Sequence, residues 1–212
     1  GVKSSELTYL GCHSDLWSFK KNDFSTFIYN NHLQKKIPTI KKSWSKLGLI
    51  KKDIANFTNV NPKCEIYNGV HDSNACYFLY KKLIKQKFTL ISTGTWIVIF
   101  NQSMKSKFLD ERKEIFSKLN VFGQKISVVR FMGGREFSFL IKKIQKNVIF
   151  KKIDIKFFLE KKIFPIPSFA NGGPNKDQKG KILNKNFLRS KNQLYILATL
   201  YIALYTDYCL DL

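Results

Sequence analysis

The sequence predicts a mixed α/β fold, and three stretches lead to this prediction. Residues 64–70 read as a short strand, and residues 72–84 follow with apolar side chains at helical spacing. Residues 88–101 are rich in strand formers and contain a glycine turn, which is the pattern of a β-hairpin. Residues 126–131 read as another strand, from which a double-glycine turn leads into an amphipathic helix. Strands that alternate with helices in this way indicate an α/β protein.

The region before residue 60 gives weaker signals. Gly11 and the polar residues after it predict a loop. Trp44, Leu47 and Ile50 have loose helical spacing, and residues 53–57 predict one short helix. The segment from Pro38 to Phe57 is interpreted as scaffold.

Further helices are expected in the second half of the chain. Residues 110–119, 154–163 and 193–212 each read as helical; the first is charged, and the last is apolar nearly all round and therefore buried. In the helix after the double glycine, Arg135 and Glu136 read as a surface pair. The apolar stripe expected on that helix consists of Phe137, Leu140, Ile141 and Ile144.

The chain is strongly basic, with a formal net charge of +22 in 212 residues. Such a charge suggests nucleic acid or an acidic surface as a partner. However, nearly all of the basic residues are lysine, whereas specific nucleic-acid contacts usually depend on arginine forks. The lysines are scattered as pairs, which is typical of a solvated surface. We therefore expect no nucleic-acid partner.

The cysteine and hydropathy patterns indicate whether the protein is a metal-binding, an oxidised or a membrane protein. The four cysteines have no CxxC spacing, so the sequence predicts no metal site and a reduced, cytoplasmic protein. Residues 194–205 are apolar, but this run is too short to span a membrane. No membrane partner is expected. The cysteines are Cys12, Cys64, Cys76 and Cys209.

Two motifs about twenty residues apart are candidates for chemistry. Asp72 lies between a short strand and a helix, where it is either an N-cap or a general base. Thr93, Gly94 and Thr95 form the expected hairpin tip, which either simply closes the hairpin or offers hydroxyl and N–H groups to an anion. For each motif taken alone, the structural alternative (N-cap or hairpin turn) is the stronger one. The two motifs together suggest a phosphoryl-transfer site. In the helix that starts at Asp72, the apolar residues at helical spacing are Ala75, Phe78, Leu79 and Leu83.

The motifs resemble those of the FGGY carbohydrate kinases, and the resemblance is strongest to the rhamnulokinase-like and fuculokinase-like branch. Five stretches occur in the family's order and span nearly the whole chain. They are residues 11–17 (Gly-Cys-His-Ser-Asp-Leu-Trp), 71–75 (His-Asp-Ser-Asn-Ala), 92–96 (Ser-Thr-Gly-Thr-Trp), 130–136 (Arg-Phe-Met-Gly-Gly-Arg-Glu) and 206–211 (Thr-Asp-Tyr-Cys-Leu-Asp).

The resemblance implies an actin-like (ribonuclease H-like) ATPase fold in a parent protein about twice as long. Residues 1–86 would be the end of a sugar-binding first domain that carries the catalytic aspartate. Residues 87–212 would be the start of an ATP-binding second domain. A natural short protein is the alternative. The sequence also leaves open a homodimer of the full-length protein.

The resemblance implies an ATP-dependent sugar kinase that uses Mg²⁺ and a ketose or related sugar. Asp72 matches the family's base. The implied substrate contacts are His13, Asp15, Trp17, His71 and Ser73, each with a structural alternative such as a local turn or a buried tryptophan. The implied nucleotide contacts are Thr93, Gly94, Thr95, Gly133 and Gly134; the last two also suit a tight turn.

Two parts of the family pattern are missing from the sequence. These are the amino-terminal phosphate loop, which also helps to hold the metal, and the later glycine-rich adenosine segment. A chain without them is expected to bind ATP poorly and to be inactive by itself. The alternative function is a non-catalytic basic protein that binds nucleic acid or sugar.

Overall fold

A computed structural model describes residues 2–12, 14, 16–141, 148–149 and 151–212, without the side chains of Cys12 and Ser106. The chain separates into two compact units. The first contains Gly1–Gln86 and Ser117–Ile126, and the second contains Lys87–Phe116 and Ser127–Leu212. Residues 117–126 therefore belong to the first unit, although the residues on either side of them belong to the second.

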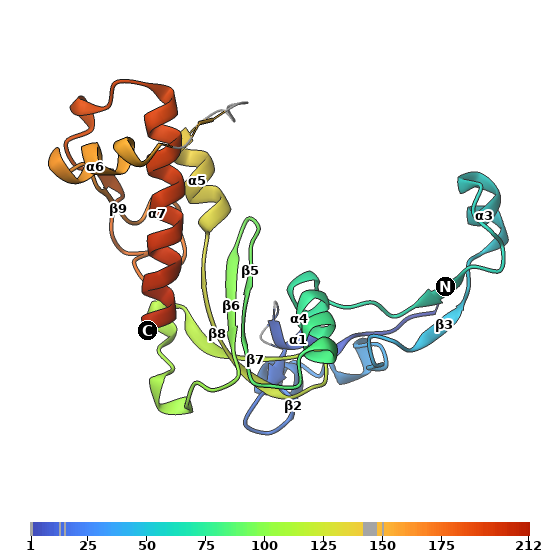
Figure 1. The fold of residues 1–212 in the computed structure, drawn as a ribbon. Coiled ribbons are helices and arrows are strands. Elements are labelled where there is room, and N and C mark those ends of the chain that lie inside the picture. The colour runs from blue at the N-terminus through green and yellow to red at the C-terminus, as the bar shows by residue number, and fades with distance from the viewer. Residues whose placement is uncertain (1, 13, 15, 142–147, 150) are drawn as a thin grey trace. The chain divides into compact units, whose positions relative to one another are not determined.

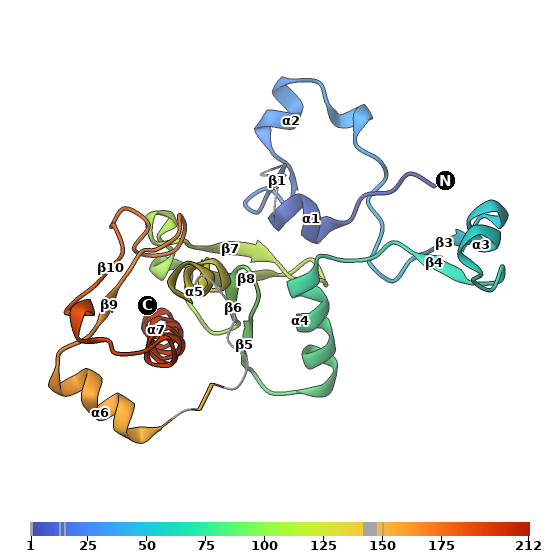
Figure 2. The same cartoon turned by 90° about the horizontal axis from the view of Figure 1, so that it is seen from above.

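The first unit is built from short elements, which Figure 1 shows in blue to green. Its helices are α1 (Leu7–Cys12), α2 (Thr26–Asn30), α3 (Lys52–Thr58) and α4 (Asp72–Leu83), with a 3₁₀ turn at Gln34–Lys36. Its strands form two antiparallel pairs: β1 (Trp17–Ser18) with β2 (Asp23–Phe24), and β3 (Lys46–Leu49) with β4 (Glu65–Tyr67). Figure 2 shows β3, β4 and α3 together as one extended arm.

The expectation that Gly11 lies in a loop is wrong. Gly11 lies in helix α1 rather than in a loop, and an added Cβ there would be 3.2 Å from the Leu119 side chain. The carboxylate of Glu6 begins this helix by accepting hydrogen bonds from the backbone N–H groups of Thr8 and Tyr9. The stabilised helix start and the close approach to Leu119 explain why a glycine occurs inside a helix here.

The region from Trp44 to Ile50 forms strand β3 instead of a helical segment. Gly48 has φ +148° and lies at a register shift between β3 and β4. Lys46 lies opposite Tyr67 in the register, and its side chain forms an ion pair with Glu65 of the partner strand. The predicted strand at residues 64–70 is reduced to the three exposed residues of β4. The short helix predicted at residues 53–57 is present as α3.

Helix α4 is present as predicted, but it buries a different face. Leu79 and Leu83 are 54% and 69% exposed, whereas Asn74 and Tyr77 are buried. The reason is that Asn74 faces the segment 117–126, where its Nδ2 lies 3.4 Å from the Leu119 carbonyl oxygen. A distant polar contact therefore sets the orientation of the helix.

The second unit contains a four-stranded sheet with strand order β5-β6-β8-β7. Its strands are β5 (Thr89–Ser92), β6 (Ile97–Asn101), β7 (Ile115–Leu119) and β8 (Lys125–Phe131), and the compact-unit boundary divides the β7–β8 hairpin. β5 pairs antiparallel with β6, and β6 with β8. The predicted hairpin at residues 88–101 and the predicted strand at 126–131 are confirmed.

The charged helix expected at residues 110–119 is wrong. Glu111–Lys113 is a 3₁₀ turn, Glu114 has φ +56°, and Ile115–Leu119 is strand β7. Ile115 and Leu119 are both buried, and a spacing of four residues suits one face of a helix and one face of a strand equally well. Pairing with β8 decides between them.

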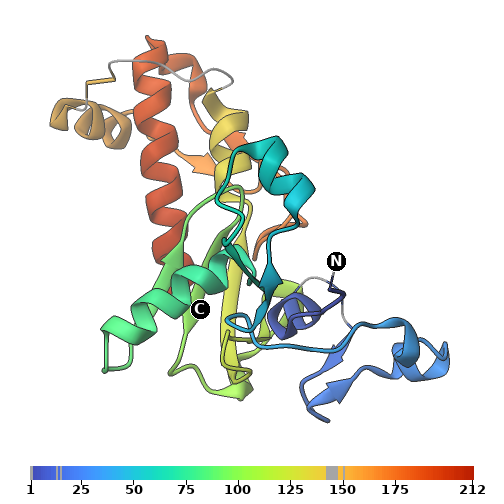
Figure 3. The same cartoon turned by 90° about the vertical axis from the view of Figure 1, so that its right-hand side faces the viewer.

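Helices α5 (Gly133–Ile141) and α7 (Lys191–Asp211) pack on one face of this sheet and run side by side (Figures 1 and 3). Figure 2 looks nearly along α7, with α5 beside it. The remaining elements are α6 (Lys152–Glu160), the paired strands β9 (Pro165–Ile166) and β10 (Lys181–Ile182), and 3₁₀ turns at Ser106–Phe108 and Lys185–Phe187. The core of the unit combines residues of β6, β7, β8, α5 and α7: Ile97, Ile99, Ile115, Val129, Phe131, Leu140, Ala198, Tyr201, Tyr205 and Cys209.

Two predictions about these helices need correction. Glu136 is not a surface residue but is fully buried. Helix α7 is not buried all round, because Leu204 is 65% exposed on its outer side. The apolar stripe of α5 is confirmed for Phe137, Leu140 and Ile141, which contact the core, whereas Ile144 lies outside the described residues.

Candidate functional site

Asp72 is the first residue of α4, and its carboxylate is held on one side only. Its Oδ1 accepts from the backbone N–H of Ser73 at 2.6 Å and from the Ser73 hydroxyl at 3.3 Å, and lies 3.1 Å from Nε2 of His71. No described residue contacts Oδ2, and the side chain is 91% exposed. The carboxylate is therefore fixed in orientation but keeps one oxygen available as a proton acceptor.

The structure bears on the alternative that Asp72 is a helix cap. His71 occupies the N-cap position, with extended backbone, and its side chain makes no capping hydrogen bond. Asp72 lies one residue later, inside the first turn of the helix. Its contact with the Ser73 N–H contributes to this first turn and leaves Oδ2 without a hydrogen bond from a described residue.

Trp17 lies in strand β1 and packs edge-on against Phe24, with ring centroids 5.7 Å apart. Its Nε1–H is buried and has no hydrogen-bond partner among the described residues. Trp17 thus combines a packing role with an unused donor. The two other residues of its predicted contact surface, His13 and Asp15, lie outside the described residues.

A separate candidate in the second unit is the tip of the β5–β6 hairpin, where Thr93, Gly94 and Thr95 are all exposed. The carbonyl oxygen of Gly94 accepts a hydrogen bond of 3.1 Å from the backbone N–H of Gly134, at the start of α5. The tip is therefore fixed to the N-terminus of a helix, and its hydroxyl and N–H groups are presented to solvent.

The glycines around this tip have different reasons to be glycine. An added Cβ on Gly133 would lie 2.4 Å from Ile97, and one on Gly134 would lie 2.4 Å from the Gly94 carbonyl oxygen. Both residues thus allow close packing, and Gly133 is buried. By contrast, a Cβ on Gly94 would meet only the Trp96 carbonyl oxygen, at 3.6 Å. The fold itself does not require glycine at position 94.

A second glycine pair, in the loop between β9 and β10, lies against the same region. Gly172 and Gly173 have φ of +128° and +110°. An added Cβ would come within 2.6 Å of the Trp96 ring and of the Phe131 Cβ, respectively. The double glycine was the available signal, but only the fold shows which residues approach it.

Glu136 connects this loop to the helices. Its buried carboxylate accepts from the Ser168 hydroxyl at 2.7 Å, from the Phe169 N–H at 3.1 Å and from the Tyr201 hydroxyl. Burial, together with the hydrogen bond to Glu136, raises the pKa of Tyr201 above its usual value. The carboxylate thus ties α5, α7 and the 168–173 loop into one block beneath the hairpin tip.

A charged cluster adjoins Trp96, the residue after the tip. The guanidinium carbon of Arg130 lies 4.5 Å from the ring centroid of Trp96 and 4.9 Å from that of Phe116. Its Nε is 2.8 Å from Oε2 of Glu114, and Nζ of Lys176 is 3.4 Å from the other oxygen of that carboxylate. The cluster contains two cations and one anion.

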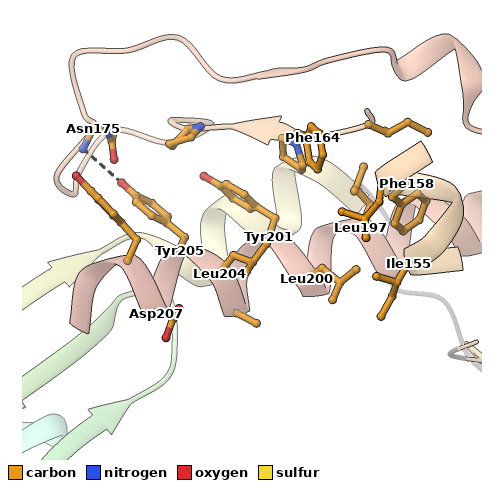
Figure 4. A pocket seen from close by; sticks show the side chains of 16 residues that line it. Ile155, Phe158, Phe164, Asn175, Leu197, Leu200, Tyr201, Leu204, Tyr205 and Asp207 are labelled. Carbon is orange, nitrogen blue, oxygen red and sulfur yellow. Dashed lines mark hydrogen bonds between the residues drawn. The ribbon is translucent and has the colours of Figure 1, made fainter. Parts of the chain in front are cut away.

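An apolar pocket of about 840 Å³ lies along α6 and α7 in the second unit (Figure 4). Its walls include Phe158, Leu197 and Leu204, and its few polar groups include Asn175, whose backbone N–H donates to the Tyr205 hydroxyl at 3.3 Å. None of the candidate site residues lines it. Its chemistry suits an apolar group rather than phosphate.

No group of three histidine, cysteine or acidic side chains among the described residues is arranged to hold a metal ion. In that part of the chain, no helix combines the length and apolarity needed to cross a lipid bilayer.

Comparison with known families shows where the chain belongs. Residues 85–212 match the family described as carbohydrate kinase FGGY, C-terminal domain. This match covers more than half of the chain, so the chain belongs to the FGGY carbohydrate kinase family. The family resemblance expected from the sequence is confirmed at this level, and the match does not distinguish the branches of the family.

Solved structures agree with this assignment. A carbohydrate kinase from Novosphingobium aromaticivorans is 27% identical, with a TM-score of 0.75, and the alignment covers 99% of this chain and 48% of that one. A xylulose kinase from Lactobacillus acidophilus is 11% identical with a TM-score of 0.60, and the alignment covers 96% and 43%. A gluconate kinase from the same organism is 12% identical with a TM-score of 0.58, and the alignment covers 94% and 42%. The chain thus spans less than half the length of these proteins, and the two less similar ones support the fold alone.

No curated protein matched the sequence.

Proposed function

We propose that the chain is part of an ATP-dependent sugar kinase that phosphorylates a hydroxyl of a ketose or related sugar. The proposal rests on family membership and, within the structure, on one observation: the carboxylate of Asp72 is fixed through Oδ1 and open at Oδ2. An open, oriented carboxylate is what proton removal from a hydroxyl needs. Within the family, the rhamnulokinase-like and fuculokinase-like branch is our preferred assignment because of the motifs around Asp72 and Gly94.

In the proposed reaction, Oδ2 of Asp72 accepts the proton of the attacking sugar hydroxyl. The hydroxyl oxygen forms a bond to the γ-phosphorus of ATP, the bond from that phosphorus to the bridging oxygen breaks, and ADP leaves. The transition state of phosphoryl transfer is loose, so orientation of the hydroxyl matters more than the strength of the base. His71 and Ser73 hold the carboxylate for this purpose.

The exposed turn of Thr93, Gly94 and Thr95 is our candidate for contact with the nucleotide phosphates. Its open hydroxyl and N–H groups fit an anion, and Gly94 has no packing reason to be glycine. Gly133 and Gly134 act by positioning this turn. Mg²⁺ in kinases is usually held by one or two carboxylates and by phosphate oxygens. The described residues offer isolated carboxylates of this kind rather than a preformed metal site.

Turnover of ATP by the full-length kinase, of which we propose this chain to be a part, tests the proposal with a panel of ketoses, deoxy-ketoses and sugar acids, and Asp72→Asn is the variant. We expect one sugar to drive turnover and Asp72→Asn to reduce kcat by at least about 100-fold while ATP binding is unchanged. Asp53→Asn, which also removes a first-turn acid from a helix of the same unit, is the matched control. A rate in Asp72→Asn equal to that of the wild-type protein would overturn the assignment of the base.

A further inference from the structure

We propose that Arg130 binds an anionic group, a carboxylate or a phosphate, carried by the substrate or the nucleotide. The inference rests on the proposed function for the identity of these ligands. It begins with the place of Arg130 in the sheet. Arg130 pairs with Val98 across β6 and β8, beside Ile97 and Phe131, which belong to the core under α5 and α7. Because side chains alternate along a strand, Arg130 projects from the opposite face of the sheet.

The guanidinium is held rigidly in this position. The rings of Trp96 and Phe116 lie within 5 Å of its central carbon, so its faces are occupied by aromatic contacts. Its Nε is committed to Glu114. A planar guanidinium held in this way has little rotational freedom to lose when it binds a ligand.

The Nη groups of Arg130 remain available. No described residue accepts a hydrogen bond from them, although the side chain is only 31% exposed. These groups form a fork, which matches the two oxygens of a carboxylate or phosphate. The fork is therefore an unused recognition element in a partly desolvated place.

The charge of the cluster points to an anion rather than to a neutral hydroxyl. Glu114 is shared between Arg130 and Lys176, and its side chain is only 14% exposed. One carboxylate cannot neutralise two cations, so the cluster retains one positive charge. Cations gathered in a partly buried place repel each other, and an added anion would relieve this repulsion.

The neighbourhood connects this charge to the candidate phosphate site. Trp96 directly follows Thr95, and the Lys176 backbone N–H donates to the Gly173 carbonyl at 3.2 Å in the loop that packs on Trp96. Two kinds of ligand share the required chemistry: the carboxylate of a sugar acid and the phosphates of the nucleotide. The experiment must separate them.

Calorimetric titration of the protein tests the proposal with D-gluconate, its neutral counterpart D-glucitol, and inorganic tripolyphosphate. Arg130→Gln is expected to weaken binding of gluconate, of tripolyphosphate or of both by about tenfold or more, which is typical for loss of a charged hydrogen bond. D-Glucitol should bind equally to both proteins. Weakening for gluconate identifies the acceptor as the source of the anion, and weakening for tripolyphosphate identifies the nucleotide.

Two further variants separate binding from structural support. Arg130→Lys keeps the charge beside Glu114 but lacks the fork, so thermal unfolding should stay near the wild-type value while anion binding falls. Arg112→Gln is the matched control, because Arg112 also pairs with a carboxylate through Nε, at 3.1 Å, but is 90% exposed. It should leave anion binding unchanged.

Absence of anion binding by the wild-type protein, or equal binding by wild-type and Arg130→Gln, would overturn the inference. These titrations need no turnover. Failure to find a sugar that is phosphorylated would therefore count against the proposed function alone.

Discussion

At the level of single residues, Gly94 and Gly134 lie in contact but should respond differently to alanine. In Gly134→Ala, the new methyl group would collide with the Gly94 carbonyl oxygen, which is a backbone atom that cannot move aside alone. We expect a loss of about 1–3 kcal/mol in the free energy of unfolding, as for other overpacked sites. Urea unfolding measures this loss.

The same substitution at Gly94 is predicted to leave stability nearly unchanged, because its Cβ position is open. Instead, the affinity of the full-length protein for ATP should fall, since under the proposed role of the turn the methyl group would stand where a phosphate approaches. A large stability loss in Gly94→Ala, or normal ATP affinity together with normal stability, would contradict the role given to the turn.

The support of Asp72 gives a second prediction at this scale. In His71→Ala, the group 3.1 Å from Oδ1 is lost, while the Ser73 N–H contact remains. The carboxylate should become less well oriented, so kcat should fall by about tenfold with little change in the KM for ATP. An unchanged kcat would show that the backbone contact alone orients Asp72.

At the level of elements, Glu136 is the residue on which the arrangement of α5, α7 and the 168–173 loop depends. Glu136→Gln replaces an acceptor of three hydrogen bonds by an amide with its own N–H groups to satisfy. We expect a loss of about 2 kcal/mol in the free energy of unfolding, because a buried polar group that loses its hydrogen-bond partners carries the cost of its desolvation. Glu160→Gln, on the exposed side of α6, should change it by less than about 0.5 kcal/mol. Equal effects of the two substitutions would show that the buried network contributes nothing special.

The sequence predicted elements well where propensity and pairing agree. The hairpin at residues 88–101 combines strand formers with a glycine turn, and the structure contains it. The helix predicted at residues 110–119 was wrong because apolar residues four positions apart fit both a helix and a strand, and long-range pairing decided the outcome. The prediction of which face of α4 is buried was wrong for a related reason. The segment that packs on this helix is residues 117–126, which are far away in the sequence.

The candidate site was predictable to a similar extent. Asp72 and the Thr-Gly-Thr turn are local motifs with a chemical meaning, so they can be found without a structure. Arg130 and Glu136 form clusters with residues up to 65 positions away. Such clusters carry no local signal, which is why Glu136 reads as a surface residue from its sequence neighbours.

At the level of the whole molecule, the pH dependence of stability should be steepest at alkaline pH. Burial raises the pKa of the Cys209 thiol from 9.0 to about 12, and it raises the pKa of Tyr201 and Tyr205 as well. These groups stay protonated in the folded protein at a pH where the unfolded chain already ionises. Their stabilising contribution is complete below pH 9 and is lost as the pH rises from 9 toward 12. Urea unfolding at pH 8, 9, 10 and 11 should show this decline.

The variant Cys209→Ala tests the part of this effect that comes from the buried thiol. Removal of the buried thiol lowers stability at every pH, but the decline between pH 9 and 11 should be shallower than in the wild-type protein. Thiol labelling gives an independent check in a Cys12→Ser background: exposed Cys64 and Cys76 should react at once, and Cys209 only after unfolding. Parallel declines for both proteins would contradict the pKa assignment.

The chain path through the two units predicts how the protein responds to truncation. Residues 1–86 without residues 117–126 lack Leu119, against which Gly11 packs, and Phe122, whose ring lies 5.7 Å from that of Phe78. We expect residues 1–86 alone to show no cooperative unfolding by circular dichroism. The full chain should unfold cooperatively, and a cooperative transition in the shorter chain would show that the inserted segment is dispensable.

The same path has a consequence for how such a protein can change over evolutionary time. A gene segment that encodes the second unit cannot be exchanged cleanly for one from another protein, because it also encodes ten residues of the first. Recombination at a single breakpoint would deliver a chain in which one of the units lacks part of its interior. Because the β7–β8 hairpin contributes to both units, the two units must be inherited together, and substitutions in them must remain compatible.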